Sequence, residues 1–316
     1  MDLITSILAI TVRAGTSLVF ATIGEILTER AGIMNLGIEG IMLMGAVSSF
    51  AASFYSQNLA VALLVAMAVG AAMATLHAFL AVTMRANQVV CGISITLFGT
   101  GFSSFLGQRL GPATNNFRLM GLKGAKFSPL PVEALSDIPI LGALFSQDLL
   151  TYAVYLLIPL SWCFLYKTRP GLWLRSIGED PQTADAMGID VIKSKYLYTI
   201  LGGALMGLGG AHLSLSYTPG WSENITGGRG WIVVALVIFS MWNPARSVWG
   251  ALLFGGINAV QFRLQASGTN IPAAFLNMLP YLGTIAVLVL MTWWEALSKK
   301  IGAPAALSVP YMREDK

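Results

Sequence analysis

Long apolar runs, separated by short polar breaks, dominate the pattern of hydrophobic and polar positions in this chain. The apolar runs cover residues 3–27, 34–55, 59–83, 88–109, 149–166, 195–216, 231–242, 245–263 and 273–294. A helix that crosses a bilayer needs about 20 mostly apolar residues. The run at 231–242 is too short to cross alone, so it is either a half-helix or merges with the next run around Asn243-Pro244. The pattern predicts an all-α, polytopic membrane protein with about nine transmembrane helices, within a range of roughly 8–10.

Two long polar stretches interrupt the apolar series, at 110–148 and 167–194. The first carries four prolines and several glycines and is predicted to be an external loop. If 167–194 and the C-terminus lie in the cytoplasm and nine spans alternate, 12 of the 19 Lys and Arg residues fall inside and six outside. Cytoplasmic loops carry the excess of Lys and Arg, which favours this orientation. It places the N-terminus outside, and we expect residues 1–316 to form one transmembrane domain.

Composition supports the membrane class and excludes several functions. Of the 316 residues, 55% are hydrophobic and 11% are charged, whereas soluble domains are about 25% charged. Cys91 and Cys163 lie in apolar runs and suggest neither a disulfide nor a metal site. His77 and His212 have no second ligand at metal-binding spacing, so we expect no metal site. The basic residues are spread along the chain, which argues against nucleic acid as a partner.

The stretch GEILTERAGIMNLGIEG at 24–40 places charged groups between two apolar runs. Helical spacing brings Asn35 and Glu39 onto one face. Ionisable groups at membrane depth usually face a bundle interior or a water-filled cavity. One hypothesis is therefore that Asn35, Glu39 and Glu25 line the path of a polar solute, and the other is that they tie the first two helices together. Asn258 is a further candidate for the path, because neutral solutes need hydrogen-bond partners.

Other polar residues have structural interpretations. Arg13 lies within the first apolar run and either pairs with a carboxylate on another span or extends its side chain outward, and we favour the second. Glu223, Asn224 and Arg229 fall in a glycine-rich external loop, where we expect solvation rather than a binding role. Gly203 and Gly207 form a GxxxG pattern typical of helix packing.

The sequence GEDPQTADAMGIDV at 178–191 predicts a short capped helix in the cytoplasmic stretch. Asp180 suits the N-cap, Pro181 the first helical position and Gly188 the position after the helix. Ala184 and Met187 are three residues apart and share a face. So short a helix has little stability of its own. It either docks on a cytoplasmic partner or packs as a connector on this chain's own helix ends.

Several motifs resemble those of ABC importer permeases of the branched-chain amino acid, ribose and nucleoside group. Their cytoplasmic coupling segment resembles the run GEDPQTADAMGID, and the N-terminal signature of nucleoside and simple-sugar permeases resembles ERAGIMNLGIEGIMLMGA. Three further motifs match in the same order, namely GGRGWIVVALVIFSMWNPARS, GALLFGG and LPYLGTIAVLVL. The resemblance implies that a coupling helix passes ATP-driven motion into the membrane. The implied coupling residues are Gly178, Glu179, Asp180, Pro181, Ala184, Met187 and Gly188.

The resemblance implies a non-enzymatic permease subunit of an ABC importer in the bacterial inner membrane, moving nucleosides or simple sugars by alternating access. No GxxxxGK[ST] phosphate-binding loop is present, so the chain is expected to hold no cofactor and a partner ATPase to bind the ATP. The other implied partners are a second homologous permease chain and an external solute-binding protein or lipoprotein. The alternative is an ion-coupled secondary transporter, for which Glu25, Glu39 and Arg13 are the candidate ionisable groups.

Overall fold

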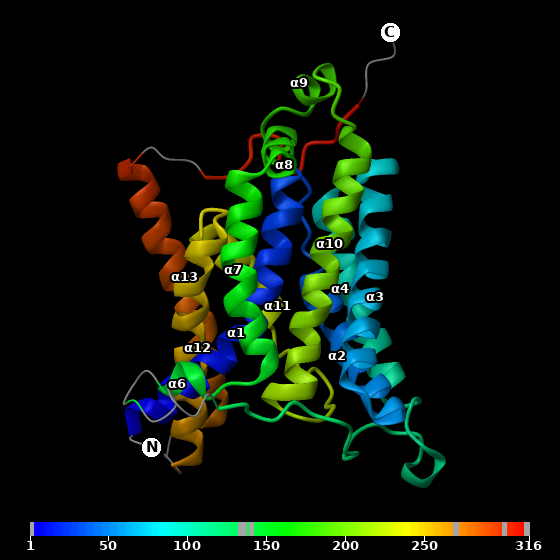
Figure 1. Cartoon of the computed structure of the whole chain (residues 1–316), viewed down its shortest axis with the longest axis vertical. Coiled ribbons are helices and arrows are strands. Elements are labelled where there is room, and N and C mark those ends of the chain that lie inside the picture. The colour runs from blue at the N-terminus through cyan, green and yellow to red at the C-terminus, as the bar shows by residue number, and fades with distance from the viewer. Residues whose placement is uncertain (1–2, 132–137, 139–141, 268–271, 299–301, 313–316) are drawn as a thin grey trace.

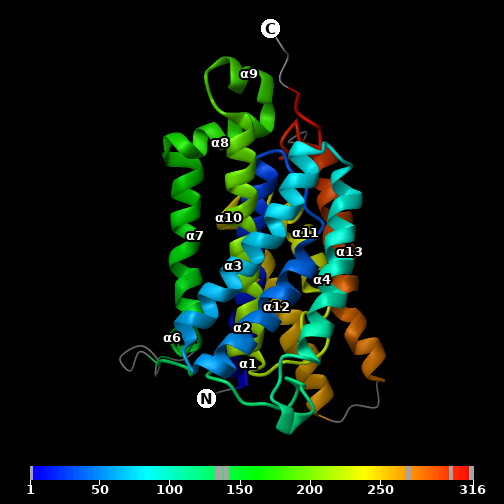
Figure 2. The same ribbon diagram turned by 90° about the vertical axis from the view of Figure 1, so that its right-hand side faces the viewer.

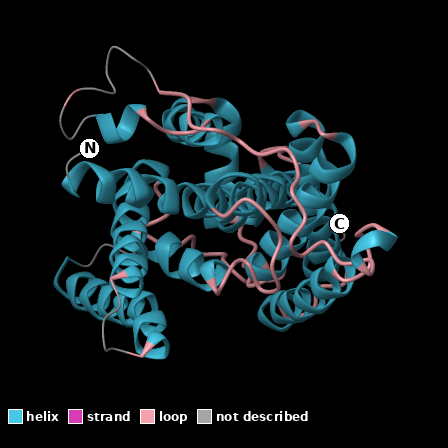
Figure 3. Cartoon of the chain, turned by 90° about the horizontal axis from the view of Figure 1, so that it is seen from below, coloured by secondary structure: helices cyan, strands magenta, loops and turns pink. Residues whose placement is uncertain are grey.

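The computed structural model describes residues 3–131, 138, 142–267, 272–298 and 302–312. The described residues form helices and loops and contain no strand (Figure 3). The helices are α1 (Leu3–Arg30), α2 (Ile38–Ser56), α3 (Leu59–Ala78), α4 (Gln88–Gly107), α6 (Gly142–Phe145), α7 (Leu149–Lys167), α8 (Arg169–Glu179), α9 (Pro181–Ala186), α10 (Val191–His212), α11 (Arg229–Phe239), α12 (Pro244–Ala266) and α13 (Ala273–Ser298), with π-helical turns η1 (Phe79–Thr83) and η3 (Leu213–Tyr217) and a 3₁₀ turn η2 (Ala113–Asn115). The all-α prediction is confirmed.

Each apolar run of the sequence corresponds to one helix, long except for α11, and these helices stand roughly side by side (Figures 1 and 2). We call the end of the bundle that carries α8 and α9 the α9 end, and the opposite end, where α1 begins, the α6 end. In the part of the chain that the structure describes, five helices are long and apolar enough to cross a membrane, namely α1, α2, α3 with η1, α4 and α7. Shorter apolar helical stretches cover Arg229–Phe239 and Phe275–Leu290. The chain is therefore a membrane protein, and the count of nine spans stays a prediction.

Helices α1, α2 and α10 pack at the centre of the bundle with α3 against α2 and α10, and small residues let these helices approach closely. A Cβ atom at Gly207 of α10 would collide with the Ala66 carbonyl oxygen of α3, and one at Gly203 would collide with the Ala74 side chain. The GxxxG pattern is thus a packing face, as predicted. Helices α3 and α7 bury only 28% of their most apolar windows, against 72% for α1, so their apolar outer faces suit contact with lipid.

Two helices begin inside the bundle rather than at its ends. Helix α11 has 11 residues, and Asn243 caps the separate helix α12 with Pro244 at its first position. The run at 231–242 therefore does not merge with the next one. Helix α2 begins at Ile38, after a non-helical stretch at 31–37. Irregular backbone at this depth is tolerated where protein or a cavity satisfies it.

The α9 end is closed by short elements. Asp180 Oδ1 accepts hydrogen bonds from the backbone N–H groups of Gln182 and Thr183, and Gly188 has a φ of +84°, so the predicted caps of α9 are confirmed. These hydrogen bonds, with one from Thr183 Oγ1, hold the pKa of the exposed Asp180 carboxyl below its usual value. After α13, residues 302–312 run along this end as a non-helical segment with turns at 305–308 (Figure 1).

Candidate functional site

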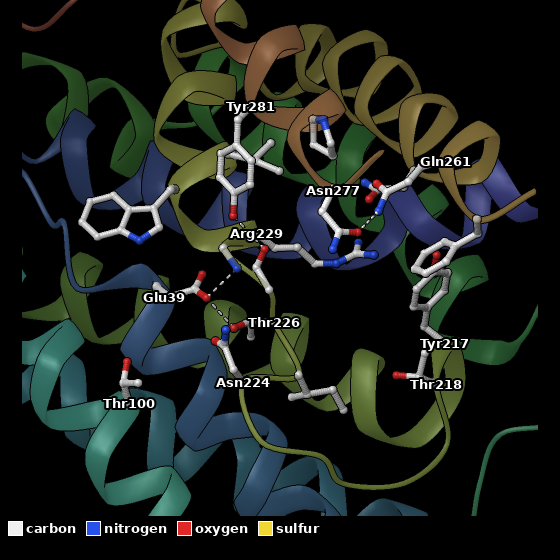
Figure 4. A pocket seen from close by; sticks show the side chains of 18 of the residues that line it. Glu39, Thr100, Tyr217, Thr218, Asn224, Thr226, Arg229, Gln261, Asn277 and Tyr281 are labelled. Atoms are coloured by element: carbon white, nitrogen blue, oxygen red, sulfur yellow. Dashed lines mark hydrogen bonds between the residues drawn. The ribbon is translucent and has the colours of Figure 1, made fainter. Parts of the chain in front are cut away.

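A cavity of about 620 Å³ lies beside the start of α11, within the size range of small-molecule sites (about 300–1,000 Å³). It is lined by Glu39, Thr96, Thr100, Tyr217, Thr218, Asn224, Ile225, Thr226, Gly227, Gly228, Arg229, Trp231, Ile232, Asn258, Gln261, Phe262, Asn277, Pro280 and Tyr281. Thr96 and Thr100 belong to the middle of α4, which places the cavity at an intermediate depth of the bundle. Figure 4 shows that side chains from α2, α12, α13 and the segment before α11 meet around it.

Glu39 joins the start of α2 to the start of α11 in the cavity wall. Its Oε1 accepts hydrogen bonds from Thr226 Oγ1 (2.5 Å) and the Gly228 N–H (2.9 Å), and its Oε2 accepts one from the Gly230 N–H (2.6 Å). A carboxylate is favoured at a helix N-terminus because unpaired N–H groups and the helix dipole both attract negative charge. Both carboxylate oxygens are therefore engaged by the protein itself.

Arg229 is buried at the first position of α11 and turns away from solvent. Its Nη1 donates to the Ala14 carbonyl oxygen at 2.9 Å and to Ser17 Oγ at 3.2 Å, both near the middle of α1. Its guanidinium carbon lies 4.8 Å from the centre of the Tyr217 ring, a cation–π contact. The expectation that this arginine is solvated in a loop is wrong, because the loop ends at residue 228 and the side chain packs against α1.

The rest of the polar lining is uncharged. Gln261 Nε2 donates to Asn277 Oδ1 at 2.8 Å, which links α12 to α13 (Figure 4). Gln261 is 6% exposed, and its Oε1 accepts no hydrogen bond from the described residues. Asn258, which also lines the cavity, donates through Nδ2 to the Phe254 carbonyl oxygen. A buried unpaired acceptor is costly, so a cavity-bound hydroxyl that donates to Gln261 would be stabilised.

Aromatic rings supply the apolar part of the wall. Tyr217 ends η3, Trp231 lies in α11, Phe262 in α12 and Tyr281 in α13. Tyr281 Oη donates to the Gly227 carbonyl oxygen at 3.0 Å, and a Cβ atom at Gly228 would collide with this hydroxyl. Gly228 also has a φ of +82°, so glycine is required both for the backbone turn and for the approach of Tyr281.

The structure separates the four residues proposed for the solute path. Glu39 and Asn258 line the cavity, whereas Asn35 and Glu25 lie outside it and are fully buried. The Asn35 N–H donates to Glu25 Oε1 at 3.1 Å, and Asn35 Oδ1 accepts from the Gly37 N–H at 2.9 Å. These contacts fasten the 31–37 stretch to α1. The geometry of this pair therefore favours the hypothesis that Asn35 and Glu25 tie the first two helices together.

The predicted coupling residues gather at the α9 end, away from the cavity. Ala184 is buried among Ile177 and Val191, while Met187 is 79% exposed. Ala184 and Met187 therefore do not form one contact face, because α9 ends at Ala186, before Met187. Gly178 packs closely on the Arg30 carbonyl oxygen of α1, and the Glu179 carboxylate lies 3.9 Å from Arg30 Nη1. This segment is both packed on its own chain and exposed at Met187.

A charge cluster near the α6 end, in which Asp148 and His212 are buried and Arg13 is partly exposed, corrects two expectations. Arg13 Nε lies 4.0 Å from Asp148 Oδ2, so Arg13 pairs with a carboxylate of another helix instead of extending outward. His212 Nε2 lies 3.7 Å from the same oxygen, so this histidine is not isolated. Asp148 also caps α7 through the N–H groups of Leu150 and Thr151. Among the described residues, no group of three or more His, Cys, Asp or Glu side chains could hold a metal ion.

Sequence reasoning missed several lining residues. Gln261 and Tyr281 lie inside apolar runs, and Tyr217 directly follows one, so their polar atoms gave no periodic signal. Thr226 was overlooked in the glycine-rich stretch before α11. The signal that could have found Thr226 and Arg229 is the sequence GGRG, since paired glycines before a short apolar run are compatible with a helix N-terminus held by a carboxylate.

Residues 6–291 match the family described as branched-chain amino acid transport system / permease component. A protein of Haloferax volcanii, named as a proposed glucose ABC transporter permease, is 39% identical over 99% of this chain and 99% of its own. A guanosine ABC transporter permease of Bacillus subtilis is 32% identical over 94% of this chain and 93% of its own. A nucleoside ABC transporter permease of Lactococcus lactis is 36% identical, with 94% of each chain covered.

The fold also resembles that of a solved structure described as an inward-facing conformation of a proposed metal-chelate type ABC transporter. The TM-score is 0.50 at 16% sequence identity, covering 92% of this chain and 85% of the other. At this identity the likeness concerns the fold alone.

Proposed function

This chain belongs to the family of permease components of branched-chain amino acid transport systems, and from this membership we propose that it is the membrane-spanning subunit of an ABC importer for nucleosides or simple sugars. It is a transport subunit and not an enzyme. Two of the relatives above are named for nucleosides or guanosine and one for glucose. These solutes share a ring with several hydroxyl groups and carry no net charge.

The observation that carries the substrate class is the uncharged polar lining of the cavity. The two charged residues in its wall, Glu39 and Arg229, are both bound by the protein's own groups. Hydroxyl and amide groups remain for a solute, and a site of this kind favours a neutral polyhydroxylated molecule over an ion. The aromatic rings of Tyr217, Trp231 and Tyr281 can stack on a nucleobase or a sugar ring. A nucleoside, which offers both an aromatic base and hydroxyls, uses both parts of the lining.

Helix α11 supplies a mechanical link between the cavity and the α9 end. The first turn of α11 is held by Glu39. The turn that follows the C-terminal end of α11 is held by Glu29, whose Oε2 accepts a hydrogen bond from Trp242 Nε1. Arg30 Nη2 donates to the Trp242 carbonyl oxygen, and Arg30 Nη1 faces Glu179 of the coupling segment. A shift of the coupling segment would therefore move α11 and with it one wall of the cavity.

We place the α9 end in the cytoplasm, where a separate ATPase binds α9 and drives alternating access of the cavity to the two sides. In this arrangement nine spans cross the membrane and the N-terminus is external. A second permease chain completes the translocation unit, and an external solute-binding protein or lipoprotein delivers the solute. The family membership supports the ATPase, and the excess of Lys and Arg at the α9 end supports the orientation.

The test is uptake of radiolabelled guanosine, adenosine, ribose and glucose by source cells with and without this chain. We expect deletion to abolish ATP-dependent uptake of at least one nucleoside. Loss of ribose or glucose uptake alone would keep the importer and change the substrate to a sugar. Uptake that persists after ATP depletion and stops when ion gradients collapse would contradict the importer and support an ion-coupled carrier.

Replacing Gln261 by leucine is expected to raise the KM for the transported solute by about 3- to 10-fold, because one neutral hydrogen bond contributes about 0.5–1.5 kcal/mol. The measurement is the concentration dependence of uptake. Gln265→Leu is the matched control, since Gln265 Nε2 also donates to Asn277 Oδ1, at 3.1 Å, but does not line the cavity. An equal rise in KM for both variants would assign the effect to the helix contact and not to the solute.

A further inference from the structure

The C-terminal segment, residues 302–312, is bound to the coupling segment by its backbone. The Ala306 N–H donates to the Gly178 carbonyl oxygen at 2.8 Å, and the Ala305 N–H donates to Glu179 Oε2 at 3.3 Å. The Ser308 N–H donates to the Gly32 carbonyl oxygen at 3.3 Å, beside the end of α1. A segment held to its neighbours by backbone hydrogen bonds at several points is a fixed part of this surface.

Apolar contacts anchor the C-terminal segment at both of its ends. Ala303 and Leu307 pack against the buried cluster that contains Trp242. Tyr311 packs against the cluster that contains Ala184 of α9. The segment therefore bridges the turn after α11 and the coupling helix, the two parts of the α9 end that lie on the link to the cavity.

A cleft of about 240 Å³ opens between the start of α9 and the C-terminal segment. It is lined by Glu179, Asp180, Pro181, Gln182, Ala305, Ala306, Val309, Pro310, Tyr311 and Met312. Val309 and Met312 are 52% and 59% exposed, and the only charged residues in this lining are acidic. One wall is thus apolar, and the other carries two carboxylates, of which Glu179 also lies 3.9 Å from Arg30 Nη1 and Asp180 also caps α9. Lysine and arginine side chains match such a cleft, because they combine an aliphatic stem with a cationic tip.

We propose that this cleft is a second docking point for the ATPase, which inserts a lysine or arginine side chain between α9 and the C-terminal segment. The inference rests on the proposed function, since it needs an ATPase at the α9 end. Charge favours this occupant, because the two carboxylates in the lining belong to exposed residues and attract a basic group. The ATPase would then contact two segments that are joined to each other and to α11.

The test compares two double variants of the intact permease. The lysine variant carries Val309→Lys together with Met312→Lys, and the glutamate variant carries Val309→Glu together with Met312→Glu. Both side chains are exposed, so neither change disturbs the packed parts of the segment. The permease is purified from source-cell membranes, and the co-purifying ATPase is quantified by mass spectrometry through its phosphate-binding loop peptide. Relative to the unchanged permease, we expect the amount of ATPase that co-purifies with the lysine variant to fall by at least about tenfold, because like charges repel. For the glutamate variant we expect the amount to fall by less than about threefold.

Met84→Lys is the matched control, because Met84 is 61% exposed near the same end, next to Thr83, whose hydroxyl bonds Tyr196 of α10. It should retain the ATPase. Equal retention by both double variants would overturn the docking point, and equal loss would overturn its preference for a basic side chain. If neither these variants nor the unchanged permease co-purifies with an ATPase, the proposed function itself fails. If only changes at Met187 release the ATPase, the proposed function stands and this inference is wrong.

Discussion

Replacing Glu39 by glutamine is expected to lower uptake by about 10- to 100-fold. Glutamine keeps one acceptor oxygen and places an amide N–H₂ group against the N-terminus of α11, where the Gly228 and Gly230 N–H groups now donate to the carboxylate. A hydrogen bond to a charged group contributes about 1.5–3 kcal/mol, and a buried donor left without a partner costs about 1–3 kcal/mol. The first turn of α11 would move, and with it the cavity wall that carries Thr226 and Arg229.

The measurement is solute uptake normalised to the amount of variant in the membrane. Glu25→Gln is the control, because Glu25 is also fully buried but lies outside the cavity. Its Oε1 accepts from the Asn35 N–H, and glutamine can keep this contact through its own carbonyl oxygen. We expect Glu25→Gln to retain uptake within about twofold. If both variants lose uptake equally, or if Glu39→Gln is merely absent from the membrane, a specific role of Glu39 in the cavity wall is contradicted.

The helical pattern was predictable because it depends on local sequence. The length of each apolar run sets a helix, the dipeptide Asn243-Pro244 sets the break between α11 and α12, and Asp180 with Gly188 sets the ends of α9. These features need only neighbours within a few residues. Gly203 and Gly207 were also informative, since a small-residue stripe has few uses in a membrane helix other than close packing.

The cavity was less predictable because its residues converge from distant parts of the chain. Glu39 meets the Gly228 N–H across 189 positions, and Arg229 reaches Ala14 across 215. Sequence spacing carries no information about such pairings. The loop interpretation of Arg229 failed because a glycine-rich stretch can mark a helix start inside the bundle as well as an external turn. Asn35 and Glu39 share helical spacing, yet α2 begins only at Ile38, so they serve different contacts.

The coupling segment gives the second large expected effect, at Met187. This side chain is 79% exposed directly after α9, whereas Ala184 is buried in the protein's own core. The surface that remains for a partner therefore includes Met187, and replacing it by aspartate removes an apolar contact and adds a charge without disturbing internal packing. Interface positions of this kind can contribute about 2 kcal/mol or more to binding, which corresponds to a roughly 30-fold loss of ATPase affinity and a similar loss of uptake at limiting ATPase.

Met84→Asp is the control for Met187→Asp, since it places the same charge at a similarly exposed methionine near the same end. The measurements are ATPase co-purification and ATP-dependent uptake, with elution on size-exclusion chromatography as the test of folding. We expect Met84→Asp to match the unchanged permease in all three. Normal ATPase binding by Met187→Asp would contradict the docking role and leave α9 as a connector held by Ala184. Loss of both ATPase binding and uptake, with unchanged elution, would separate the docking surface from the internal packing of the same short helix.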